Sequence, residues 1–300
     1  MKLIYETVHG SRAYGLARAG SDTDLKGIVV GPAAWYHGFV GGPEQVDVSP
    51  DHVRYEIRKY MRLLAANNPN LLELLWTDAE HHRTVTPAGR VLLDARGSAL
   101  SKKVADTFGG YALSQLKRIK GHRSWLLDPP TTAPTRAAFG LPDTALLPKD
   151  QLGAAEALLA REDADADMTP NFLALLDRER RYRAAKATWK QYRGWVANRN
   201  PARAALEGRF GYDTKHAMHL VRLQRMAVEI LVHGVVRVRR EDREELLAIR
   251  DGAWTYDELI ANSEALSDGI RAARAVSSLP DDVDRAALDA LCVRIVEMSL

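Results

Sequence analysis

Sequence patterns typical of β-strands are confined to the first quarter of the chain, and this restriction limits the possible folds more than any other feature. Residues 2–8, 23–30 and 51–57 mix apolar and β-branched residues, with glycine, proline or other turn-forming residues at their borders. From about residue 100 onward the apolar residues recur with helical spacing. The sequence therefore predicts an α+β fold, in which a small head with a mixed sheet and helices is followed by an all-helical body.

Helical spacing is distributed over most of the remaining chain. Two short helices are expected at 58–66 and 70–76, separated by the helix-breaking Asn67-Asn68-Pro69. Longer helices are expected at 104–119, 152–161, 171–193, 213–233, 241–250, 256–275 and 284–299. Residues 128–150 contain five prolines and predict a long loop. We expect one domain at 1–95 and a helical domain at 96–300.

Composition excludes several classes of protein. The 300 residues carry a net charge of +3, which is too small to indicate nucleic-acid binding by itself. Cys292 is the sole cysteine, so neither an intramolecular disulfide framework nor a cysteine-based zinc site is expected. The N-terminus lacks the apolar stretch of a signal peptide, and no segment approaches the roughly 20 apolar residues that span a bilayer. A cytoplasmic protein without membrane contact is the expectation; the oligomeric state is not indicated.

Two short motifs near the N-terminus indicate a candidate site. Gly10-Ser11 follows the first predicted strand, and after a spacer of ten residues Asp22 and Asp24 open the second. Residues two apart on a strand point to the same side, so both carboxylates should face one site. Two like charges this close are unfavourable unless a cation lies between them, and carboxylate oxygens suit Mg²⁺. The sequence therefore predicts a metal site at Asp22 and Asp24.

The glycine–serine pair complements this site. Gly10 allows the backbone to approach a phosphate closely, and Ser11 and Arg12 can direct a hydroxyl, amides and a positive charge at it. An isolated Asp-x-Asp is most often a turn or a solvated edge, and a Gly-Ser pair alone carries no information. The combination of strand, turn, spacer and acidic pair favours catalysis on a phosphate-bearing substrate, because phosphoryl transfer requires both charge neutralisation and alignment.

This combination resembles the signature of the DNA polymerase β-like nucleotidyltransferase superfamily. Within it, the chain is similar to the RNA repair pathway DNA polymerase β family. The resembling segments are residues 10–16, 21–27, 55–60, 68–75 and 215–223. The resemblance implies a nucleotidyltransferase head at 1–95, with the helical domain closing its cleft. It also implies two Mg²⁺ or Mn²⁺ ions and transfer of a nucleoside monophosphate from an NTP such as ATP to an acceptor hydroxyl, with release of pyrophosphate.

The acceptor and the third metal ligand are less well defined. The family association makes an RNA end the leading acceptor; a protein hydroxyl or a small molecule are alternatives, as is a non-catalytic nucleotide-binding, antitoxin-like module. The superfamily adds a third carboxylate on a neighbouring strand, and Asp51 and Glu56 are the candidates. Because they are five residues apart, they should face opposite sides of the strand. We favour Asp51 as the third ligand, since Glu56 can instead be an acid of the first helical turn.

Basic residues supply candidate partners for phosphates. Lys215, His219 and Arg222 have i, i+4 and i+7 spacing and form one stripe of a predicted helix. On its own this stripe is typical of a solvated face, but the resemblance favours nucleotide binding. Glu73 is expected to be structural and to cap a helix or pair with a nearby cation.

Two further basic segments, 117–125 and 178–199, contain aromatic residues. They could follow an RNA backbone and stack a base, or simply be solvated helices. For Trp189 and Trp195 in the second segment we favour core positions.

Overall fold

A computed structural model of the chain describes residues 1–145, 153 and 170–300. The chain divides into two compact units, Met1–Lys120 with Leu206–Leu300 and Gly121–Ala205, and each is described by itself. Apart from residue 153, the helix expected at 152–161 lies outside the described residues, as does the end of the proline-rich segment. Among the described residues, no helix is long and apolar enough to cross a bilayer.

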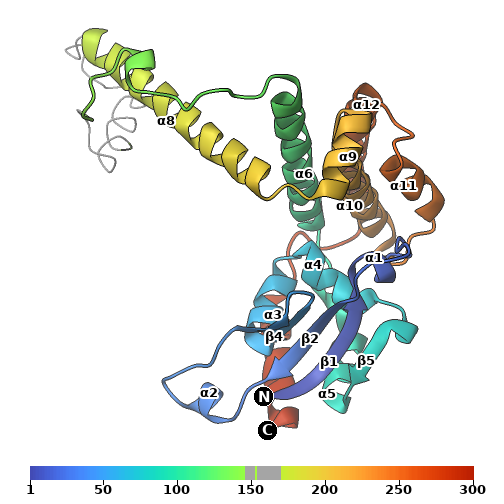
Figure 1. Cartoon of the computed structure of the whole chain (residues 1–300). Coiled ribbons are helices and arrows are strands. Elements are labelled where there is room, and N and C mark those ends of the chain that lie inside the picture. The colour runs from blue at the N-terminus through green and yellow to red at the C-terminus, as the bar shows by residue number, and fades with distance from the viewer. Residues whose placement is uncertain (146–152, 154–169) are drawn as a thin grey trace. The chain divides into compact units, whose positions relative to one another are not determined.

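The first unit contains a mixed five-stranded sheet with the order β3-β4-β2-β1-β5 (Figure 1). The strands are β1 (Lys2–His9), β2 (Asp24–Val30), β3 (Gln45–Ser49), β4 (His52–Glu56) and β5 (His82–Val85). β1 pairs antiparallel with β2 and β5, and β3 pairs antiparallel with β4, whereas β2 and β4 are parallel. The predicted α+β class with a mixed sheet is confirmed. β3 and β5 were not predicted, and β2 begins one residue later than expected.

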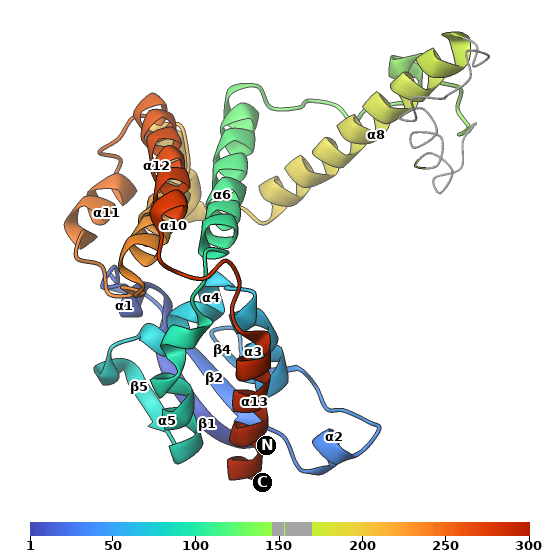
Figure 2. The same ribbon diagram turned by 180° about the vertical axis from the view of Figure 1, so that it is seen from behind.

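Helices cover one face of this sheet, as Figure 2 shows from behind. They are α3 (Ile57–Ala65), α5 (Pro87–Asp94) and, from the far end of the chain, α13 (Arg285–Ser299), which contacts both of the others. The short α4 (Pro69–Leu72) and the 3-10 helix Glu73–Trp76 cross the same face. Burial drives this arrangement, because Ile4, Tyr5, Ile28 and Ile57 are at most 2% exposed.

The remaining helices of the first unit complete its helical part. They are α1 (Gly10–Ala13), α2 (Ala34–His37), the N-terminal portion of α6 (Val104–Leu127), the end of α9 (Pro201–Phe210), α10 (Thr214–His233), α11 (Arg243–Arg250) and α12 (Tyr256–Val276). α10 is the most buried of these, and it packs against α11 and α12. Asp213 caps α10 by accepting a hydrogen bond from the His216 backbone N–H at 3.0 Å. The all-helical body predicted after the sheet is confirmed, although α13 returns to the sheet and the division at residue 95 stays a prediction.

The second unit is built around α8 (Pro170–Ala197), preceded by the loop that follows α6. The described part of the proline-rich segment forms this loop and a single 3-10 turn at Ala137–Phe139. Arg136 fastens the turn to α8 through a bidentate ion pair with Glu179, at 3.1 and 2.9 Å. Near the other end of α8, Trp125 and Trp195 pack with their ring centroids 5.5 Å apart.

Candidate active site

The glycine–serine turn lies at the end of β1, where α1 begins. Gly10 has a φ of +68°, a left-handed conformation that side chains rarely adopt. A Cβ atom at this position would lie 2.1 Å from the Asp24 Oδ2 atom. Both the backbone conformation and the close approach of Asp24 therefore require glycine, and the turn and the acidic motif form one structural feature.

Asp22 and Asp24 reach this place by different routes. Asp24 is the first residue of β2 and lies opposite His9 in the ladder with β1. Asp22 lies before the strand, so the strand alternation expected from the sequence does not account for its position. Instead, the Arg12 guanidinium donates hydrogen bonds to the carbonyl oxygens of Ser21 (2.8 Å) and Asp22 (3.2 Å), which fastens this segment to α1.

A cleft of about 700 Å³ brings most of the predicted site residues together. The predicted residues that line it are Gly10, Ser11, Asp22, Asp24, Lys215, His219 and Arg222. Arg12, Asp51 and Glu56 are not among its lining residues. The two acidic residues and the turn come from the start of the chain and the basic stripe comes from α10, so the cleft joins segments about 200 residues apart in sequence.

Further basic residues in the cleft were not predicted as site residues. Arg18 and Arg250 line the cleft, as does Arg118, which belongs to one of the basic segments recognised in the sequence. Burial, followed by the nearby charge of Arg18, lowers the pKa of Arg250. Arg18 itself is paired with Asp251 at 2.6 Å, and the charge of Asp251 offsets part of this effect on Arg250. Arg18 and Arg250 lie on a loop and at the end of α11, so no spacing in the sequence could have related them.

A buried hydrogen-bond network centred on Glu73 includes two residues that line the cleft, Tyr14 and Arg222. The Glu73 carboxylate accepts from the Tyr14 hydroxyl at 2.6 Å and the Arg222 guanidinium at 2.7 Å, and lies 3.2 Å from His9 Nε2. The Arg222 guanidinium also lies 3.8 Å from the centroid of the Tyr14 ring. Burial alone would raise the pKa of Glu73, but the charge of Arg222 and the hydrogen bonds hold this pKa well below its usual range. Arg222 is thus the cation that was expected to pair with Glu73. The helical stripe together with the resemblance had instead favoured nucleotide binding for Arg222.

His219 faces a strongly positive environment. Burial, and then the charges of Arg222 and Lys215, lower the pKa of His219 to about 3. Its imidazole is therefore neutral at physiological pH and presents a hydrogen-bonding group to the cleft without adding charge.

Of the two candidates for the third carboxylate, Asp51 immediately precedes β4 and Glu56 is its last residue. The Asp51 carbonyl accepts from the Leu25 N–H at 2.7 Å, which places Asp51 beside Asp24. Glu56 lies beside Val29, which is five residues from Asp24 along β2, or roughly 16 Å at the usual rise per residue. Glu56 caps α3 by accepting from the Arg58 N–H at 3.0 Å, and it also accepts from Tyr36 at 2.9 Å. These contacts match the alternative considered for Glu56, an acid in the first turn of a helix.

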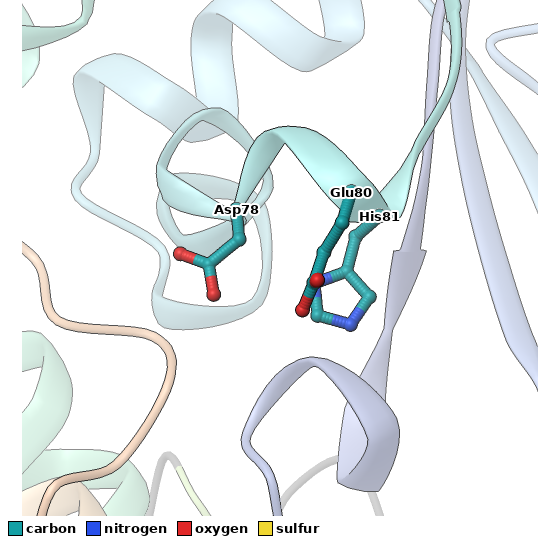
Figure 3. A group of neighbouring side chains, drawn as sticks. All are labelled: Asp78, Glu80 and His81. Carbon is teal, nitrogen blue, oxygen red and sulfur yellow. The ribbon is translucent and has the colours of Figure 1, made fainter.

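A separate cluster of metal-ligating groups precedes β5, as Figure 3 shows. One atom each of Asp78, Glu80 and His81 lies within 4.8 Å of the others, and no sequence pattern had indicated this group. The Arg239 guanidinium contacts both carboxylates, at 3.4 and 2.7 Å. The single positive charge of Arg239 therefore compensates part of the negative charge of the two carboxylates.

Comparison with known proteins supports the resemblance seen in the sequence. Residues 1–126 match the model of the RNA repair pathway DNA polymerase beta family, a family of polymerase β-like nucleotidyltransferases in RNA repair, and the resemblance is confirmed over these residues. The match includes the turn, the acidic pair and Glu73, and ends before α10. A curated relative, "Uncharacterized protein YcgL" of Bacillus subtilis (strain 168), is 32% identical over 95 residues, or 29% of this chain. The chain spans 35% of that protein's length. No solved structure matches.

Proposed function

We propose that the chain transfers a nucleoside monophosphate from an NTP to an acceptor hydroxyl and releases pyrophosphate. The observation that carries this proposal is the cleft, whose lining includes Asp22 and Asp24 together with several basic side chains, namely Arg18, Arg118, Lys215, Arg222 and Arg250. An NTP bears a dense negative charge on its phosphates, and a site that reacts with it must neutralise that charge and orient the α-phosphate. The family matched by residues 1–126 supports the same reaction class.

Asp22 and Asp24 are suitable ligands for divalent metal ions. In the described part of the chain, neither Asp22 nor Asp24 forms an ion pair, and Gly10 leaves the Asp24 carboxylate room that a Cβ would fill. Carboxylate oxygens are the ligands that Mg²⁺ or Mn²⁺ takes together with phosphate oxygens. We assign Asp22 and Asp24 as ligands of two such ions, with Asp51 as the third. When bound, the ions neutralise phosphate oxygens and favour ionisation of the acceptor hydroxyl.

The chain's own groups bind and align the substrate. The Gly10 turn places backbone amides and the Ser11 hydroxyl at the cleft, where they can hold phosphate oxygens. Lys215 and Arg250 supply positive charge for the leaving pyrophosphate, and Arg18, which is paired with Asp251, lies beside them in the lining of the cleft. In the reaction the acceptor oxygen bonds to the α-phosphorus, the bond to the β-phosphate breaks, and the hydroxyl proton passes to solvent.

We propose an RNA end as the acceptor, on the support of the family description. The test is incubation of the full chain with each α-labelled NTP, Mg²⁺ or Mn²⁺, and separate RNA, DNA and protein acceptors. Label should appear on RNA and should require the metal. Asp24→Asn should abolish transfer while the circular dichroism spectrum stays unchanged, and Asp257→Asn at an exposed position on α12 serves as the matched control. Transfer to a protein or a small molecule in place of RNA would overturn the acceptor, and activity retained in Asp24→Asn would overturn the site.

A further inference from the structure

The second unit carries a groove that is separate from the catalytic cleft. It has a volume of about 860 Å³ and follows one side of α8, where five basic side chains line it against two acidic ones. Of the acids, Glu179 is already paired with Arg136 and with Arg183 at 3.1 Å. The groove is therefore an electropositive surface in a chain whose net charge is only +3.

Aromatic rings alternate with cations along this groove. Tyr182, Lys186, Trp189 and Arg193 have i, i+4, i+7 and i+11 spacing, so they form one stripe of α8, with Lys190 beside it. Lys186 lies 5.9 Å from the Tyr182 ring centroid, and the Arg193 guanidinium lies 5.9 Å from that of Trp189. Within the described residues, Lys186, Lys190 and Arg193 form no ion pair with an acid.

Neighbouring rings contact these two side chains without burying them: Tyr182 packs edge-on against Phe139 at 5.7 Å between ring centroids, and Trp189 packs against Tyr192 at 5.8 Å. From Arg180 to its last residue, no described side chain of α8 is buried, and Tyr182 and Trp189 are only half-buried. The core position favoured for Trp189 from the sequence is therefore wrong, and Trp195 is also only half-buried. Trp195 has a structural role, because it packs against His122 and Trp125. Tyr182 and Trp189 line the groove, and the Arg136 guanidinium lies 5.4 Å from the Tyr182 ring centroid. The parts of the two rings that remain exposed can be covered by a ligand.

We propose that this stripe of α8 binds single-stranded nucleic acid, with Tyr182 and Trp189 stacking on bases and Lys186, Lys190 and Arg193 contacting phosphates. A flexible polyanion with planar bases matches both features, since base stacking on aromatic rings and backbone neutralisation are the two contributions to such binding. A duplex would keep its bases stacked internally and would not use the rings. A membrane surface would require an apolar helix face, which α8 lacks because arginine and lysine occur all around it.

The role of this groove in the reaction rests on the proposed function, whereas the binding of nucleic acid does not. In that role the groove would hold the strand whose end is modified. Binding itself is independent of catalysis, and it can be measured without NTP or metal.

The test is fluorescence anisotropy of a labelled 12-nucleotide single-stranded RNA titrated with the full chain at several salt concentrations. Lys190→Ala/Arg193→Ala should weaken binding about tenfold and reduce the salt slope by about 1.4, at 0.7 per phosphate contact. Trp189→Ala should weaken binding about 5- to 150-fold without changing the slope, and Trp189→Phe should retain most of the affinity. The matched control is Arg180→Ala/Arg181→Ala, which removes two charges from α8 residues outside the groove.

Several outcomes would overturn the proposal: no RNA binding at low salt, equal losses in the groove and control variants, or equal affinity for a polyglutamate peptide. The Asp24→Asn variant separates this inference from the proposed function, because it should bind RNA like the wild type. If no acceptor is labelled but the groove variants selectively lose RNA, the proposed function fails and this inference holds. If RNA is labelled but binding is insensitive to the groove variants, only this inference fails.

Discussion

Glu73→Gln should be among the most destabilising conservative changes in this chain. The substitution keeps the shape of the side chain but removes the charge that balances Arg222, which is only 4% exposed. Removing one partner of a buried ion pair leaves an uncompensated buried charge and typically costs about 3–5 kcal/mol. Domains are stable by only about 5–15 kcal/mol, so this loss is a large fraction of the total. Urea unfolding monitored by circular dichroism measures it directly.

The control is the same chemical change at an exposed ion pair. Glu44 pairs with Arg62 at the surface, and both side chains are about 60% exposed. Glu44→Gln should therefore lower the free energy of unfolding by less than about 1 kcal/mol. Glu73→Leu/Arg222→Met, which removes both charges, should be less destabilised than Glu73→Gln. Equal losses in Glu73→Gln and Glu44→Gln would refute the central role of the buried pair.

The pH dependence gives an independent check on Glu73. Its pKa is lowered in the folded protein, so the unfolded chain takes up the proton first as the pH falls. The stabilising contribution is therefore complete above the ordinary carboxyl pKa of about 4.5 and is lost progressively below it. The difference in unfolding free energy between wild type and Glu73→Gln should be constant from pH 7 to about pH 5 and should narrow below about pH 4.5. A difference that widens on acidification would contradict the assigned direction.

Two further predictions concern the cleft itself. Gly10→Ala should lower nucleotidyl transfer at least 100-fold, because its Cβ would meet the Asp24 carboxylate. Gly20→Ala carries the same positive-φ strain but has nothing within 4 Å of its Cβ, so it should keep most of the activity. Comparable activities of the two variants would show that activity does not depend on the close approach of Gly10 to Asp24. Asp51→Asn should lower kcat by about 100-fold or more with little change in stability, whereas Glu56→Gln should lower the free energy of unfolding by about 1–2 kcal/mol through the cap of α3 and leave kcat nearly unchanged. Steady-state kinetics and urea unfolding on the same preparations check both, and the reverse pattern would exchange the roles of the two carboxylates.

The elements that sequence reasoning recognised are those with a strong local pattern. β1 and β2 contain runs of apolar residues, and Asp213 and Gly234 mark the two ends of α10. β3 and β5 were missed because both are short and have no fully buried residue, so they show no clear alternation. They become strands only because β4 and β1 offer an edge with which they pair. Pairing of this kind is a tertiary property that a local pattern does not contain.

The same distinction applies to the candidate site. Gly10, Ser11 and Asp24 lie within fifteen residues of one another, so their spacing alone indicated a common site. The association of Arg222 with Glu73 spans 149 residues, and the approach of Arg250 to Arg18 depends on how α11 packs. Residues brought together by packing show no spacing in the sequence, and the helical stripe of α10 therefore indicated which side chains share a face but not what each of them contacts.

The contacts of that stripe give its members different roles. Arg222 is held by Glu73 and Tyr14, so the pair joins α10 to the turn and to the 3-10 helix that begins at Glu73. A substitution at Arg222 therefore changes the architecture of the cleft together with any phosphate binding, and kinetic parameters alone cannot separate the two. Lys215 lies seven residues earlier, nearly two helical turns or roughly 10 Å toward the start of α10, and is only partly buried. A substitution at Lys215 therefore tests phosphate binding by α10, whereas a substitution at Arg222 tests the integrity of the cleft.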